Sequence, residues 1–133
     1  MKGGESILKQ QCYGVEIELT GITRKQAADA LAELFGTTSR YIGGSYDAYT
    51  VKDQEGKEWR TMNDSSITPQ KRQADRRVTV ADGAYKVELV TPKLTYEEMG
   101  KLQSAIRCMR KAGGFVNESC GIHVHIDGAN HTQ

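Results

Sequence analysis

Hydrophobic and polar residues alternate in three short stretches of the sequence, and a period of two is typical of a β-strand with one buried face. The stretches cover residues 14–19, 85–91 and 120–127. Side chains two positions apart lie on the same face of a strand. One face of each stretch is aliphatic, and we expect it to pack under helices. Its members are Val15, Ile17, Leu19, Val87, Leu89, Ile122, Val124 and Ile126.

Apolar residues at helical spacing predict two helices. The first runs to about Phe35, with Thr23 as its N-cap and Gly36 as its stop. Arg24 is unfavourable at the positive end of that helix dipole, so it either lies in solvent or faces an anionic group. The second helix begins near Thr95, where Glu98 completes a capping box, and ends at glycines 113 and 114.

The remaining segments complete an α+β pattern. Residues 41–44 are broken by glycines, whereas 45–52 and 57–63 are predicted strands joined by a turn at 53–56. The basic stretch 68–83 is interpreted as a solvated loop or hairpin, with phosphate or substrate contact as the alternative. The order β-α-β-β-β-α-β predicts a largely antiparallel sheet with helices packed on one face.

The polar faces of the three alternating stretches carry the candidate chemistry. Glu16 and Glu18 share one face, Glu88 stands on the second stretch, and His123, His125 and Asp127 share a face of the third. If these strands belong to one sheet, their carboxylates and imidazoles converge. Such a donor set suits magnesium, manganese or zinc. The alternative is an exposed edge strand with two incidental histidines.

Length and composition set limits on the protein class. The chain has 133 residues, 26% of them charged, and a formal net charge of +1. These values predict a single domain over residues 11–133 after a flexible start at 1–10, with no bulk attraction to nucleic acid or membrane. No signal peptide or membrane span is evident, so we expect a cytoplasmic protein. The three cysteines are interpreted as buried thiols, with metal ligation as the alternative.

Four motifs in order resemble the amidoligase family, within the glutamine synthetase and glutamate–cysteine ligase superfamily. They are Gly14-Val-Glu-Ile-Glu-Leu, Trp59 followed by Asp64-Ser-Ser-Ile, Glu88-Leu-Val-Thr-Pro, and Cys120-Gly-Ile-His-Val-His-Ile-Asp. The resemblance implies a glutamine synthetase-like half-domain. It also implies an enzyme that activates a carboxylate with ATP and then joins it to an amine.

The same resemblance assigns roles to individual residues. Metal ligands, for Mg²⁺ or Mn²⁺, are implied at Glu16, Glu18, Glu88 and His123. His125 resembles the histidine nearer the ATP phosphates, and Asp64 resembles an acid of the acceptor-substrate region. Family members continue beyond the His-x-His strand, so we expect a domain truncated at its C-terminus, with little or no turnover alone.

Three functions remain open from the sequence. The first is an amidoligase acting on a peptide or amino-acid carboxylate. The second is a non-catalytic module of the same fold that binds a metal, a nucleotide or a protein partner, or that forms a homo-oligomer. The third is a metal-dependent hydrolase or nuclease. Against the third, no activated nucleophile stands out, because Ser65 and Ser66 are better explained as turn-capping residues.

Overall fold

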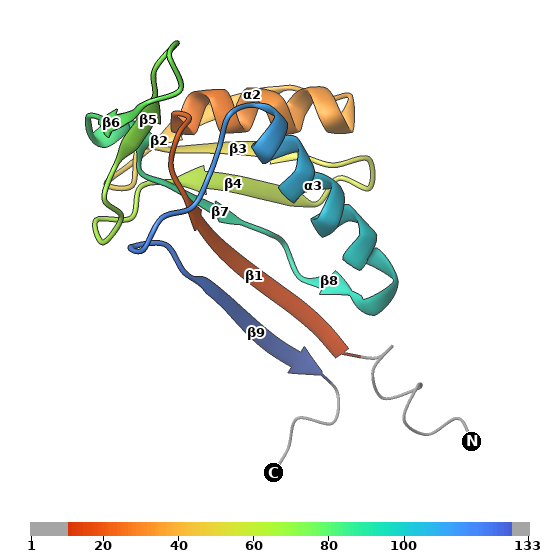
Figure 1. The fold of residues 1–133 in the computed structure, drawn as a ribbon. Coiled ribbons are helices and arrows are strands. Elements are labelled where there is room, and N and C mark those ends of the chain that lie inside the picture. The colour runs from red at the N-terminus through yellow and green to blue at the C-terminus, as the bar shows by residue number, and fades with distance from the viewer. Residues whose placement is uncertain (1–10, 129–133) are drawn as a thin grey trace.

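The computed structural model describes residues 11–128, which contain two α-helices and nine strands (Figure 1). The expected flexible start, residues 1–10, lies outside the described residues. In chain order the elements are β1 (Gln11–Leu19), α2 (Arg24–Phe35), β2 (Ser39–Gly43), β3 (Ala48–Lys52), β4 (Glu58–Met62), β5 (Gln70–Arg72), β6 (Val78–Val80), η1 (Gly83–Tyr85), β7 (Val87–Val90), β8 (Leu94–Thr95), η2 (Tyr96–Glu98), α3 (Met99–Lys111) and β9 (Ile122–Gly128).

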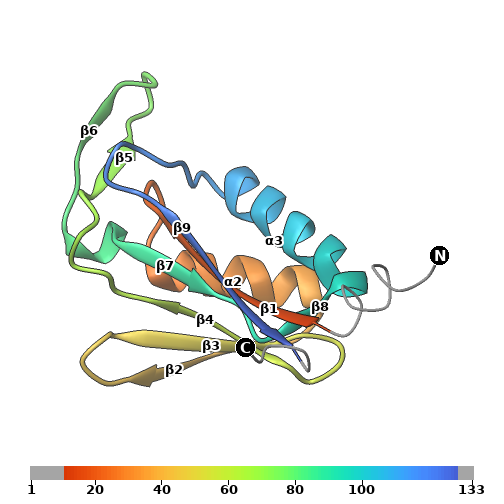
Figure 2. The ribbon, with the colours of Figure 1, turned by 90° about the horizontal axis from the view of Figure 1, so that it is seen from below.

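Seven strands form one antiparallel sheet, and both α-helices cover the same face of it (Figure 2). The strand order is β2-β3-β4-β7-β1-β9, and the short β8 pairs with the start of β1 on the β7 side. Strands β5 and β6 make a separate hairpin. The predicted α+β class, with a largely antiparallel sheet and helices on one face, is confirmed. No helix within residues 11–128 has the length and apolar character needed to cross a membrane.

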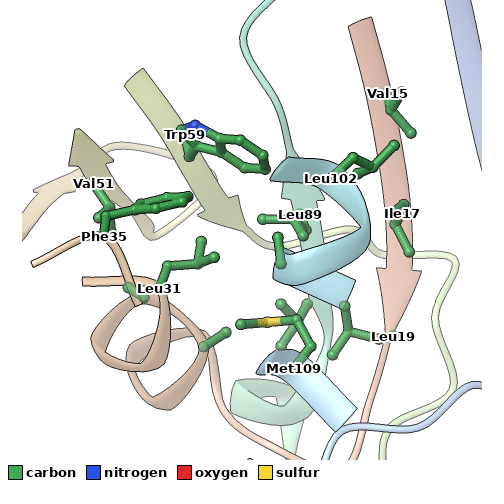
Figure 3. Packing of buried hydrophobic residues seen from close by; sticks show 14 of the residues in the cluster. Val15, Ile17, Leu19, Leu31, Phe35, Val51, Trp59, Leu89, Leu102 and Met109 are labelled. Carbon is green, nitrogen blue, oxygen red and sulfur yellow. The ribbon is translucent and has the colours of Figure 1, made fainter. Parts of the chain in front are cut away.

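The core lies between the two helices and the centre of the sheet (Figure 3). Trp59 is fully buried, its ring centroid lies 5.1 Å from that of Phe35, and its indole N–H donates to Asp53 Oδ2 at 3.0 Å. The expected burial of five aliphatic residues on β1 and β7 is confirmed. They are Val15, Ile17, Leu19, Val87 and Leu89.

Local sequence explains both ends of α2. Thr23 and Gln26 form a reciprocal capping box, and Gly36 takes the left-handed conformation (φ 71°) that ends the helix. Arg24 is not solvated. Its guanidinium pairs with Asp47 at 2.9 Å and donates to two backbone carbonyl groups of the segment before β7. The anionic group that Arg24 faces at this end of the helix is therefore the carboxylate of Asp47.

The expected burial of the β9 aliphatics is wrong. Ile122, Val124 and Ile126 are 62%, 55% and 50% exposed. They are on the helix side, because Ile122 lies opposite the buried Ile17 and Val124 opposite the buried Val15. However, β9 is an edge strand, and the buried core reaches no further than β1.

Two strands were missed by the sequence pattern. Strand β2 includes part of the stretch read as a glycine break, and it pairs with β3 through an irregular register between Tyr41 and Gly43. Strand β8 has only two residues before the capping box at Thr95. Short or irregular strands lack the length over which alternation becomes visible.

Candidate functional site

The face of the sheet away from the helices gathers the predicted acids and histidines. Glu18 pairs directly with Glu88 across β1 and β7, and Glu16 pairs directly with His123 across β1 and β9. The prediction that the three strands lie side by side in one sheet is therefore confirmed. Like charges directly opposite each other destabilise a sheet, so folding alone does not explain the Glu18–Glu88 pair.

Glu88 is the most perturbed acid of this face. Burial raises the pKa of its carboxyl group to about 7, and the negative charges of Glu16 and Asp64 act in the same direction. Burial also raises the pKa of Glu18, whose Oε1 accepts a hydrogen bond from the Gly121 N–H at 2.8 Å. The cluster thus holds more negative charge than it can stabilise by itself near neutral pH.

Asp64 joins the cluster from the loop after β4. Its Oδ1 accepts hydrogen bonds from the backbone N–H and the hydroxyl group of Ser66, at 2.9 and 2.7 Å. The backbone bond is the main reason that the pKa of Asp64 is lowered. A side-chain hydrogen bond between Asp64 and Glu18 lowers the Asp64 pKa further and raises that of Glu18. Asp64 is therefore ionised and its side chain caps the turn, and the Ser66 hydroxyl group supports that cap.

Both histidines of β9 lie beside Glu16. His123 Nδ1 is 3.8 Å from Glu16 Oε1, and His125 Nε2 is 3.5 Å from Glu16 Oε2. The imidazoles are 61% and 66% exposed, so a ligand can reach them directly. Gly14 lies opposite His125, and a Cβ atom placed on this glycine would meet no atom within 4 Å. The surface beside His125 is consequently open.

One basic residue of this face is absent from the site that the sequence predicts. Arg60 of β4 shares the polar face, pairs with Val90, and is 47% exposed beside Glu58 at 3.5 Å. A continuous cross-strand row contains Arg40, Thr50, Arg60, Val90, Glu16 and His123. The alternation of buried Trp59 and Thr61 with Arg60 could have placed Arg60 on the polar face of β4, but it carries no information on which strands lie beside β4.

The donor set fits a divalent cation in its chemistry, since carboxylate oxygens and imidazole nitrogens bind Mg²⁺, Mn²⁺ or Zn²⁺. Within residues 11–128, no three histidine, cysteine, aspartate or glutamate side chains are already arranged to hold a metal ion. Closing a coordination sphere would need side-chain rotation. His123 and His125 have exposed side chains, and Glu16 is partly exposed, which leaves room for it.

The comparison of the chain with known protein families agrees with the geometry of the site. A family model described as "Putative amidoligase enzyme" matches residues 9–133. The chain belongs to this family. No match was found among curated proteins or among solved structures.

Two basic side chains in the basic segment of this amidoligase-family chain lie against aromatic rings. The Arg72 guanidinium lies 4.7 Å from the centroid of the Phe115 ring, and Lys71 Nζ lies 5.8 Å from that of Tyr85. Arg72 also lines an apolar pocket of about 380 Å³ beside Met109, on the helix side of the sheet. The hairpin interpretation of residues 68–83 is confirmed by strands β5 and β6.

Proposed function

We propose that this protein is, or is part of, an ATP-dependent carboxylate–amine ligase that acts on a peptide or amino-acid substrate. The observation that carries the proposal is the gathering of three carboxylates and two imidazoles on three adjacent strands of an amidoligase-family chain, with the carboxylate of Asp64 beside them. In such a reaction ATP activates a carboxylate, and an amine then displaces phosphate to form an amide.

The acids of the sheet would hold Mg²⁺ or Mn²⁺ beside the nucleotide. Glu16, Glu18, Glu88 and His123 are the proposed ligands, because two direct cross-strand pairs bring them together. A bound cation would supply positive charge to the phosphate oxygens. Loss of the proton from Glu88 would accompany binding, since its pKa of about 7 lies close to neutral pH.

Three further residues would position the reactants. His125 borders the open surface at Gly14, where its imidazole can donate to a phosphate oxygen. Arg60 would place a second cationic donor on the same face, two strands from Glu16. Asp64, ionised and fixed by Ser66, would accept a hydrogen bond from the ammonium or amine group of the acceptor substrate.

Thermal unfolding with and without millimolar Mg²⁺ or Mn²⁺ tests the cation site, because a ligand that binds only the folded state raises its stability. We expect a rise in Tm for the wild type and none for a Glu16→Ala, His123→Ala double variant. The matched control is Glu33→Ala, which removes an exposed carboxylate from α2 on the helix layer. An equal rise in the double variant would refute the assigned ligands.

The ligase activity needs its own assay. ATP would be supplied with mixed amino-acid and peptide carboxylates and amines, and ADP and condensed products would be followed by mass spectrometry. Stoichiometric ADP and amide product that depend on Glu88 support a ligase. A metal-dependent rise in Tm without amide product would instead support the non-catalytic metal- or nucleotide-binding module.

A further inference from the structure

The outer edge of β9 carries backbone groups that face away from the sheet. The Val15 N–H donates to Thr91 Oγ1, and the Val15 carbonyl accepts from the Thr91 N–H, both at 3.0 Å and both toward β7. Val124 lies opposite Val15, so its own N–H and C=O point away from β1. The backbone N–H and C=O groups alternate in direction along a strand, so those of Ile122 and Ile126 also point away from β1. Within residues 11–128, only β1 pairs with β9.

This edge has few of the features that usually protect a sheet from further pairing, and its one carboxylate, Asp127, is near the end of the strand and pairs with Lys93. The opposite edge, β2, has Arg40 and an irregular register between Tyr41 and Gly43. By contrast, β9 contains no lysine, arginine or proline, and its register with β1 is regular over seven consecutive pairs. Its three aliphatic side chains are at least half exposed. Among the residues that the structure describes, this edge is therefore available to another strand.

The sequence of β9 is complementary to itself. Residues 122–126 read Ile-His-Val-His-Ile, which is identical in both directions. In an antiparallel pair with a two-fold axis at Val124, each Ile122 would face Ile126 of the partner subunit. The residues that face each other in this register are the ones with outward backbone groups, so about six hydrogen bonds can form. Aliphatic side chains would meet on one face of the sheet and imidazoles on the other.

We propose that the protein forms a two-fold dimer in which β9 pairs antiparallel with β9 of a second copy about Val124. His123 would then lie beside the partner subunit's His125, in a pair without mutual hydrogen bonds whose Cα atoms are about 4.5 Å apart. Each acidic face thereby gains an imidazole from the other copy. Sedimentation reports the pairing and product formation reports the ligase, so the two proposals can fail separately.

Sedimentation of the whole chain over a concentration series up to high micromolar tests the dimer. We expect a dimer for the wild type and a monomer for Val124→Lys, which places two ammonium groups at the two-fold axis. Val80→Lys is the matched control, because Val80 is 81% exposed on β6, in the separate hairpin, and this variant should stay dimeric. A wild type that remains monomeric, or a Val124→Lys protein as dimeric as the control, would overturn the proposal.

Cross-linking tests the register and remains informative if the lysine variant does not fold. Cysteines at Val124 in the two copies would have Cα atoms about 5.5 Å apart, within the range of a disulfide. Cysteines at Ile122 would be about 13 Å apart along the strands. After mild oxidation, Val124→Cys should run as a dimer on a non-reducing gel, whereas Ile122→Cys should match the wild type and its three native cysteines. Equal cross-linking of both variants would exclude this register.

Discussion

The titration of Glu88 provides a test of whether the acidic face lowers the free energy of unfolding. Burial and the charges of Glu16 and Asp64 raise its pKa from 4.5 to about 7. Between these values the folded protein holds a proton that the unfolded chain has lost, so the free energy of unfolding should fall as the pH rises from 4.5 to 7. The full shift corresponds to about 3 kcal/mol. Solvent screening at this partly exposed site leaves about 1–2 kcal/mol.

The perturbation is Glu88→Gln, assayed by urea unfolding at pH 5 and pH 8. The wild type should lose stability between these pH values on account of Glu88. The variant should lose less and should be more stable than the wild type at pH 8, by about 1–2 kcal/mol. Part of the loss of stability between pH 5 and pH 8 should remain in the variant, because the pKa of Glu18 is also raised. Glu33→Gln, on the exposed face of α2, should keep the full wild-type fall.

Adding Mn²⁺ should reverse the order of the two proteins at pH 8. The wild type would gain stability from the bound cation, whereas Glu88→Gln would have lost one proposed ligand. An unchanged pH dependence in Glu88→Gln without metal would refute the electrostatic reasoning. An equal gain with Mn²⁺ would refute only the role of Glu88 as a ligand.

Substitutions at four other positions test the fold and the site. Leu89→Ala should cost about 2–5 kcal/mol in urea unfolding because Leu89 is buried in the core, while Val124→Ala, compared at concentrations where the protein is monomeric, should cost under about 0.5 kcal/mol. Arg24→Ala should cost about 1–3 kcal/mol, since two carbonyl groups and Asp47 lose their hydrogen bonds to the guanidinium, and Arg24→Lys should recover little of this loss. Gly14→Val should leave the far-UV circular dichroism unchanged and weaken nucleotide binding by filling the open surface beside His125; unchanged affinity would show that this surface is not used.

Much of the fold could be predicted from the sequence because local signals act within single elements. The N-cap at Thr23 and the alternation in β1 and β7 were sufficient to place those elements and their buried faces. Burial on β9 could not be predicted in this way. Alternation shows which side chains share a face, but whether a helix covers that face depends on the strand order, and β9 lies at the edge.

The candidate site could be predicted in part from the alternation within single strands. The prediction was incomplete because it did not include the pairing between strands. The face shared by Glu16 and Glu18, and that shared by His123 and His125, follow from spacing alone, and the register then brings both sets together. Arg60 could not be assigned to the site, because only the pairing of β4 with β7 places it on the same row. Two residues that meet only because several strands pair in a given register cannot be recognised from the residue spacing within one strand.

Arg60 allows binding of metal and of nucleotide to be separated. Its positive charge should repel a divalent cation held by the acids, yet it should attract the phosphates of ATP. Arg60→Gln should therefore leave the affinity for Mn²⁺ alone equal or higher, and should weaken the binding of a non-hydrolysable ATP analogue with Mg²⁺. A charge-assisted hydrogen bond contributes about 1.5–3 kcal/mol, which corresponds to a loss of roughly tenfold or more in affinity.

Isothermal titration of the same protein with each ligand measures both affinities. Arg107→Gln is the matched control, because it removes an exposed guanidinium group from α3 on the opposite face of the sheet and should change neither value. If Arg60→Gln weakened binding of Mn²⁺ and of the analogue by the same factor, Arg60 would act by holding the strands in place. If it weakened neither, the phosphates would lie elsewhere, and the row that joins Arg60 to Glu16 would not be the nucleotide-binding row.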